Sequence, residues 1–72
     1  MFKIKVNSDG EVGYFCGMFT IKGEKLCGYE DNINHEKVKE YKRKQNAEKT
    51  IKELNDNYKS NDTISFEIVE IE

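Results

Sequence analysis

The chain has 72 residues, of which 36% are apolar and another 36% charged, and its net charge is only −2. A chain of this length forms one small domain that buries about 60% of the surface exposed by its unfolded state. This size excludes a separate catalytic domain and leaves little room for a deep pocket. We therefore expect a single domain over residues 1–72.

The first residues favour a cytoplasmic location. No apolar run approaches the roughly 20 residues of a membrane helix. The start, Met1–Val6, alternates apolar and polar residues and lacks the continuous apolar core of a signal peptide. Lys, Asn and Ile are abundant while Arg, Ala and Leu are scarce, which favours a low-GC bacterium or one of its phages as the source.

The first 22 residues predict two antiparallel strands. Phe2, Ile4 and Val6 alternate with lysines, the period of a half-buried strand. Turn-forming residues follow at 7–10, and the second strand is expected from Val12 to Lys22. We expect its two faces to hold Tyr14, Cys16 and Met18 on one side and Phe15, Phe19 and Ile21 on the other. Gly13 and Gly17 within this strand indicate a bulge or a close backbone approach.

A short third strand, Leu26–Tyr29, precedes a segment of helical composition at 34–59. At about 100° per residue, Val38 and Tyr41 lie nearly opposite a second apolar stripe, so one straight helix cannot bury both groups. That stripe consists of Ala47, Ile51, Leu54 and Tyr58. We therefore predict a short extended or one-turn segment over 36–42 and a helix from Arg43 or Gln45 to Tyr58. Asn46 is the better N-cap type at its start.

The last strand is expected from Thr63 to Ile71. Its apolar residues change face near Val69, which indicates a bulge or a strand whose end is covered on its second side. The order strand, strand, strand, helix, strand predicts an α+β fold. It would be a two-layer sandwich of one helix on an antiparallel sheet of three to four strands. The sheet face expected under the helix consists of Phe2, Ile4, Val6, Phe15 or Tyr14, Phe66 and Ile68.

Cys16, Cys27 and the single histidine, His35, are the candidates for nucleophilic or metal chemistry. The two cysteines lie eleven residues apart, which does not match the ligand pairs of zinc sites. No constellation of nucleophile, base and orienting group is recognisable. We therefore expect no catalytic residue, no metal and no cofactor, and we expect both cysteines to pack as small apolar residues. A minor redox or enzymatic role for accessible thiols is the alternative.

Charge is distributed unevenly along the chain. Residues 1–31 have a balance of −1, residues 32–52 of +4 and residues 53–72 of −5. Carboxylates on one surface can imitate a phosphate backbone and occupy a basic channel of another protein; at a sheet edge they can also simply prevent aggregation. The acidic candidates for partner contact are Glu53, Asp62, Glu67 and Glu70, and the aromatic candidates are Tyr29 and Tyr41.

The basic run Lys42, Arg43 and Lys44 beside Tyr41 suggests a contact with nucleic acid, in which Tyr41 stacks on a base. Dedicated nucleic-acid-binding domains are usually basic overall, however, whereas the pI of this chain is about 5.4. A solvated helix face is the simpler interpretation of the same run.

A recurrent pattern of small phage and mobile-element proteins resembles the stretch Gly28–Ile33, Val38, the stretch Tyr41–Lys49 and the closing strand. The chain departs from that pattern at 38–40, where it has extra residues. Some of these proteins resemble anti-CRISPR inhibitors of bacterial immunity, which are typically small and non-enzymatic. The resemblance implies a cytoplasmic inhibitor that binds a host protein or ribonucleoprotein effector, and it transfers no functional residue.

The alternative function is a nucleic-acid-binding accessory module that uses Lys42, Arg43 and Lys44. A homodimer through the edge of the sheet is left open in either case.

Overall fold

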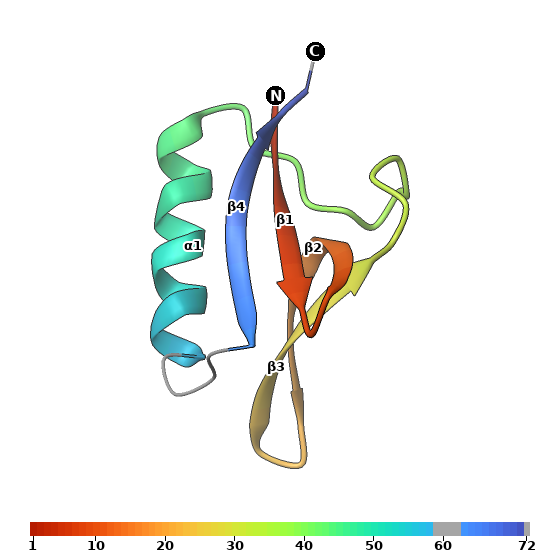
Figure 1. Ribbon diagram of the computed structural model, residues 1–72. Coiled ribbons are helices and arrows are strands. Elements are labelled where there is room, and N and C mark those ends of the chain that lie inside the picture. Colours follow the sequence, from red (N-terminus) through yellow and green to blue (C-terminus); the bar gives the residue numbers. More distant parts are fainter. Residues whose placement is uncertain (59–62, 72) are drawn as a thin grey trace.

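The computed structural model describes residues 1–58 and 63–71 (Figure 1). Its elements are β1 (Phe2–Ser8), β2 (Glu11–Ile21), β3 (Glu24–Glu30), α1 (Lys44–Asn57) and β4 (Ile64–Glu70). The strands form one antiparallel sheet in the order β3-β2-β1-β4. The helix α1 packs on one face of this sheet, mainly against β1 and β4. The predicted two-layer α+β sandwich is confirmed.

Both hairpins turn over two residues. Asp9 and Gly10 join β1 to β2, and Lys22 and Gly23 join β2 to β3. All four have positive φ, between 50° and 83°, which is the type I′ geometry whose twist matches that of paired strands. Because these turns are so short, the residues at 7–8 that were predicted to form a turn belong to β1 instead.

The predicted bulge lies in the middle of β2. Phe15 is opposite Tyr29, whereas Gly17 is opposite Gly28, so the register shifts by one residue. Gly17 has a φ of 130°, a conformation that a residue with a Cβ rarely adopts. The shift reverses the alternation of side chains along the strand. The expected grouping of Phe15 with Phe19 and Ile21 on one face is therefore wrong, because those two residues follow the shift.

Beyond the bulge, a loop segment replaces β2 along β1. β1 pairs with β2 only at residues 11–14. At the start of β1, Phe2 N–H donates to the Tyr41 carbonyl over 2.7 Å, and Tyr41 N–H donates to the Phe2 carbonyl over 2.8 Å. Lys39 N–H donates to the Phe15 carbonyl over 2.9 Å. Val38 and Tyr41 thus lie out of phase with the apolar stripe of α1 because they belong to a short extended segment, as predicted.

The helix begins at Lys44 and ends at Asn57, with Arg43 at the N-cap and Tyr58 at the C-cap. Asn46 is not the cap, since its own N–H already donates to the Arg43 carbonyl over 3.1 Å inside the first turn. The predicted stripe does face the sheet. The buried core consists of Ile4, Val6, Phe15, Ala47 and Leu54, and the half-buried residues around it include Ile51, Tyr58, Phe66 and Ile68.

The opposite face of the sheet is partly covered by the loop 31–43, as Figure 1 shows. Lys3 points to this side and is only 8% exposed, because its Nζ donates to the Ile33 carbonyl over 2.6 Å. β4 pairs with β1 in a regular register, with Val69 opposite Lys3. Of the two explanations for the change of face near Val69, coverage of the second side is therefore correct and a bulge is not.

No helix in the described part of the chain combines the length and the apolar character that a membrane crossing needs.

Candidate protein-binding surfaces

The acidic residues singled out from the sequence lie on separate surfaces. Glu67 is opposite Lys5 on the loop-covered face, and the two side chains form an ion pair of 3.1 Å. Glu70 is opposite Phe2, at the carboxyl end of β4. Glu53 is on α1 and lines a groove of about 170 Å³ between the helix and the β2–β3 hairpin. Asp62 lies outside the described residues.

The basic run is exposed at the amino-terminal end of α1. Lys42, Arg43 and Lys44 are all exposed, and the first turn of the helix has no acidic residue. Tyr41 differs from this description, because its side chain is half-buried and packs against the core. Its backbone pairing with Phe2 fixes it as a structural residue as well.

Tyr29 is the better exposed of the two candidate tyrosines, at 42%. Its ring lies over Gly13 of the neighbouring strand, where an added Cβ would collide with the ring. Glu11, Val12 and Asp31 line a surface hollow together with this ring. The result is an exposed aromatic ring, supported from below by backbone, with a carboxylate from each of two neighbouring segments.

Sequence reasoning selected Tyr29 but missed Glu11 and Asp31, which lie 20 residues apart in the chain. Only the pairing of β2 with β3 brings them together, with Tyr14 opposite Glu30. The Lys22–Gly23 turn and the Gly17 bulge together fix this register. Counting the strand pairs outward from that turn, with the bulge included, places Asp31 near the start of β2. This count is the signal in the sequence that could have located the hollow.

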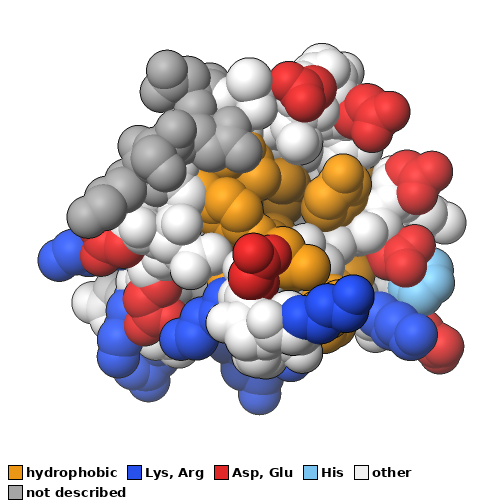
Figure 2. Space-filling model, turned by 90° about the horizontal axis from the view of Figure 1, so that it is seen from below, with side chains coloured by type: hydrophobic (Ala, Val, Ile, Leu, Met, Phe, Trp, Pro, Cys, Tyr) orange, Lys and Arg blue, Asp and Glu red, His pale blue; other side chains and the backbone are white. Residues whose placement is uncertain are grey.

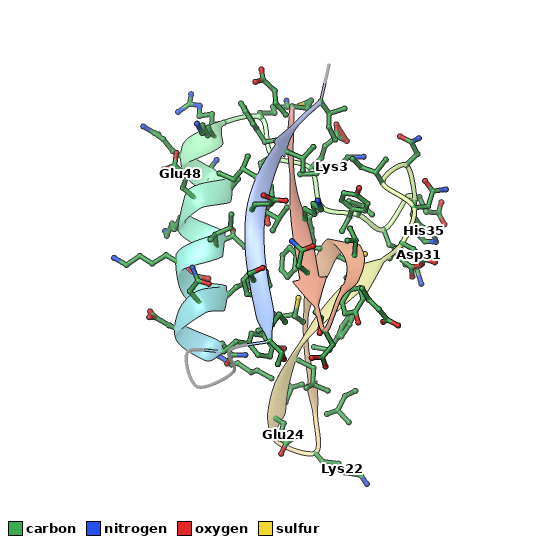
Figure 3. The ribbon with its side chains drawn as sticks, in the orientation of Figure 1. Lys3, Lys22, Glu24, Asp31, His35 and Glu48 are labelled. Carbon is green, nitrogen blue, oxygen red and sulfur yellow. The ribbon has the colours of Figure 1, made fainter. Side chains whose placement is uncertain are left out.

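Acidic side chains gather on the side of the molecule where the only histidine lies (Figure 2). Figure 3 shows Asp31 and His35 close together on that side, far from α1. The loop there has its own hydrogen bonds: His35 N–H donates to the Asn32 carbonyl over 3.0 Å, and Lys37 N–H donates to His35 Nδ1 over 3.1 Å. This local order holds the loop next to Tyr29.

A second exposed surface is the far end of the β2–β3 hairpin. Its large apolar side chains are between 38% and 53% exposed, and they are Met18, Phe19, Ile21 and Leu26. In the end view of Figure 2, apolar side chains lie at the centre, with charged side chains below them and to their right. Figure 3 places Lys22 and Glu24 at the tip of this hairpin.

The two thiols are free and partly buried. Burial raises the pKa of Cys27 from about 9 to about 11. Burial, and then the charge of Glu30, raise the pKa of Cys16. Both thiols are therefore protonated at neutral pH, whereas a nucleophilic cysteine needs a lowered pKa. Among the described residues, no group of three His, Cys, Asp or Glu side chains is placed to hold a metal ion.

Comparison with known proteins finds no matching family model, no matching curated protein and no matching solved structure.

Proposed function

We propose that this chain is a small non-enzymatic binding protein that engages a basic surface of a partner protein. The observation behind the proposal is the exposed Tyr29 ring in a hollow shared with Glu11, Val12 and Asp31. Exposed tyrosines are common anchors at protein interfaces because they combine a large contact area with a polar tip.

The support beneath the ring strengthens this proposal. The backbone at Gly13 restricts the Tyr29 side chain before a partner arrives. Ordering an interface side chain on binding costs free energy, so a ring that is already held loses less. A guanidinium group can stack on such a ring and pair with the carboxylates of Glu11 and Asp31 at the same time.

The proposed partner is a host protein or ribonucleoprotein effector of bacterial defence, met in the bacterial cytoplasm. The sequence resemblance to small phage and mobile-element proteins supports this choice, as does the chemistry of the hollow. An effector that binds nucleic acid has a basic surface, and an acidic protein can occupy it. Of the other acidic candidates, Glu67 contributes least, because Lys5 already balances its charge.

The proposal is tested by capture from a low-GC bacterial lysate with the full chain and three variants. We expect a stoichiometric protein partner with the wild type and its loss with Tyr29→Ala. The double variant Glu11→Gln/Asp31→Asn should bind at least tenfold more weakly. The matched control Glu48→Gln/Asp56→Asn removes two exposed carboxylates from α1 and should bind like the wild type. Equal binding by both double variants, or no stoichiometric partner at all, would refute the proposal.

A second candidate function, nucleic-acid binding, has one specific observation in its favour. The N-cap residue Arg43 makes no side-chain hydrogen bond to the helix, and no acidic residue occupies the first turn. Unpaired N–H groups and the helix dipole then favour an anion beside Lys42, Arg43 and Lys44. A gel shift that weakens with salt and is lost when all three become Gln would support it. No shift at low salt would exclude it.

A further inference from the structure

The segment 17–21 of β2 has an open edge. It pairs with β3 alone, and no other described segment forms a backbone hydrogen bond with it. Ile21 and Glu24 close the two-residue turn and face each other as a hydrogen-bonded pair. By alternation, Met18 and Thr20 direct their N–H and C=O groups away from β3.

The same alternation is visible on the other side of the hairpin, where the edge is occupied. Cys27 is opposite Met18, and its N–H donates to the Tyr58 hydroxyl over 2.7 Å. Lys25 is opposite Thr20, and its carbonyl accepts from Asn57 Nδ2 over 3.4 Å. The end of α1 therefore covers outward groups of β3, whereas those of Met18 and Thr20 have no such cover from residues 1–58 and 63–71.

The open edge also lacks the charges that normally protect an edge strand. Its five residues, Gly-Met-Phe-Thr-Ile, include no Lys, Glu, Asp or Pro. By contrast β4, an edge strand of the sheet, has Glu67 and Glu70. Exposed edges without charge, bulge or cover pair readily with another strand. The bulge at Gly17 lies at one end of this edge and leaves the rest regular.

The edge is complementary to itself. When a second copy is placed antiparallel about a two-fold axis at Thr20, Phe19 comes opposite Ile21 of the second copy, and Ile21 opposite its Phe19. Met18 comes opposite Lys22 of the second copy, so no like charges meet. Aromatic residues opposite β-branched residues are favourable cross-strand pairs. Leu26, opposite Phe19 within each hairpin, extends the same apolar cluster on both sides.

We propose that the chain self-associates by antiparallel addition of β2 residues 17–21 to the same edge of a second copy. The contact involves a five-residue ribbon and a few side chains, which is less than the roughly 1,200 Å² of a stable complex. The dimer is therefore weak, with a dissociation constant of roughly 10 to 100 μM. The proposal is independent of the proposed function, because none of the residues that line the Tyr29 hollow lies in this edge.

The test is sedimentation velocity of the full chain from about 5 μM to 1 mM. The expected result is a mass that rises from 8.4 kDa toward twice that value. Thr20→Lys places like charges at the two-fold axis and should weaken the dimer at least tenfold; Thr20 is exposed, so the fold is retained. The matched control is Ser65→Lys, which adds the same charge at an exposed position of β4 and should leave association unchanged.

Amide exchange of the wild type identifies the edge. Protection of the Met18 and Thr20 amides should rise with concentration, since these N–H groups become hydrogen-bonded in the dimer. A monomer at 1 mM would overturn the proposal and leave the edge for a strand of another protein. It would also be overturned by equal association of Thr20→Lys and wild type, or by concentration-dependent protection at β4 instead.

Discussion

The Lys3 ammonium group and the Ile33 carbonyl, 30 residues apart, are joined by a hydrogen bond of 2.6 Å. Lys3 lies in a strand that pairs on one side with β4, and only 8% of it is exposed. The aliphatic part of its side chain lies on the face of the sheet that α1 does not cover. Its ammonium group donates to the backbone of the loop 31–43. This bond fixes the loop whose first residue, Asp31, lines the Tyr29 hollow.

Lys3→Met should therefore loosen this loop while β1 stays in place. Methionine keeps the apolar stem and removes the donor. A hydrogen bond to a charged group contributes about 1.5–3 kcal/mol, and part of this is offset because Met needs no desolvation of a charge. We expect the free energy of unfolding to fall by about 1 kcal/mol, measured by urea denaturation. The amides of His35 and Val38, which are bonded within the loop, should exchange faster.

The control for this variant is Lys5→Met, two residues along the same strand. Lys5 pairs with Glu67, a carboxylate that is more than half exposed, and exposed ion pairs contribute about 0–1 kcal/mol. Lys5→Met should thus change stability by less than about 0.5 kcal/mol. Equal losses for the two variants would show that the Lys3 bond has no special role.

The role of Lys3 also shows where sequence reasoning ends. The alternation at the start of the chain correctly placed Ile4 and Val6 under the helix, because a period of two is a local property. The same alternation assigns Lys3 to the outward face without showing that a distant loop covers that face. The separation of the segment 36–42 from the helix was predictable, because Val38 and Tyr41 have the wrong helical phase. The residue that pairs with Tyr41, Phe2, is set by the tertiary structure and could not be predicted in this way.

The candidate sites follow the same division. Tyr29 could be selected as an aromatic residue, and the bulge could be located from Gly17. The consequence of the bulge, that Phe19 and Ile21 leave the face of Phe15, depends on counting the register through it. The helix cap lies at Arg43 and not at Asn46, and Arg43 makes no side-chain cap hydrogen bond, so the cap preference of Asn did not locate the start of this helix.

Gly13→Ala should move the Tyr29 ring without removing it. A Cβ at position 13 would collide with that ring, so either the ring or the strand must shift. We expect a loss of about 1–2 kcal/mol in unfolding free energy, together with weaker capture of the partner. In a Tyr29→Ala background the collision is absent, and the same substitution should cost at least about 0.5 kcal/mol less. Additive losses in this double-mutant cycle would contradict the packing of Tyr29 on Gly13.

Tyr58→Phe should release the β2–β3 hairpin from the end of α1. The variant keeps the ring, which packs on Phe66 at 6.0 Å between ring centres, and leaves the Cys27 N–H without its acceptor. An unsatisfied buried donor costs about 1–3 kcal/mol. We expect a loss near 1 kcal/mol, since the hairpin is partly open to water, and faster exchange of the Cys27 amide.

Tyr14→Phe is the matched control, because its hydroxyl has no hydrogen-bond partner among residues 1–58 and 63–71. Its loss should stay below about 0.5 kcal/mol. Unchanged exchange at Cys27 in Tyr58→Phe would argue against the anchor.

Cys27 should make the fold less stable in alkali. Burial raises the pKa of its thiol from about 9 to about 11 in the folded chain. Below pH 9 both states hold the proton, and this group has no effect on the pH dependence. Between pH 9 and 11 the unfolded state releases the proton and the folded state keeps it, so stability falls as pH rises. The thiol is partly open to solvent, which reduces the loss to the order of 1 kcal/mol.

Urea denaturation at pH 8.5 and 10.5 measures this loss of stability. The wild type should lose about 1 kcal/mol more than Cys27→Ala over this range. The other ionisable groups are common to both proteins, so the comparison isolates the Cys27 thiol. An equal pH dependence of the two proteins would show that the Cys27 thiol is solvated in the fold.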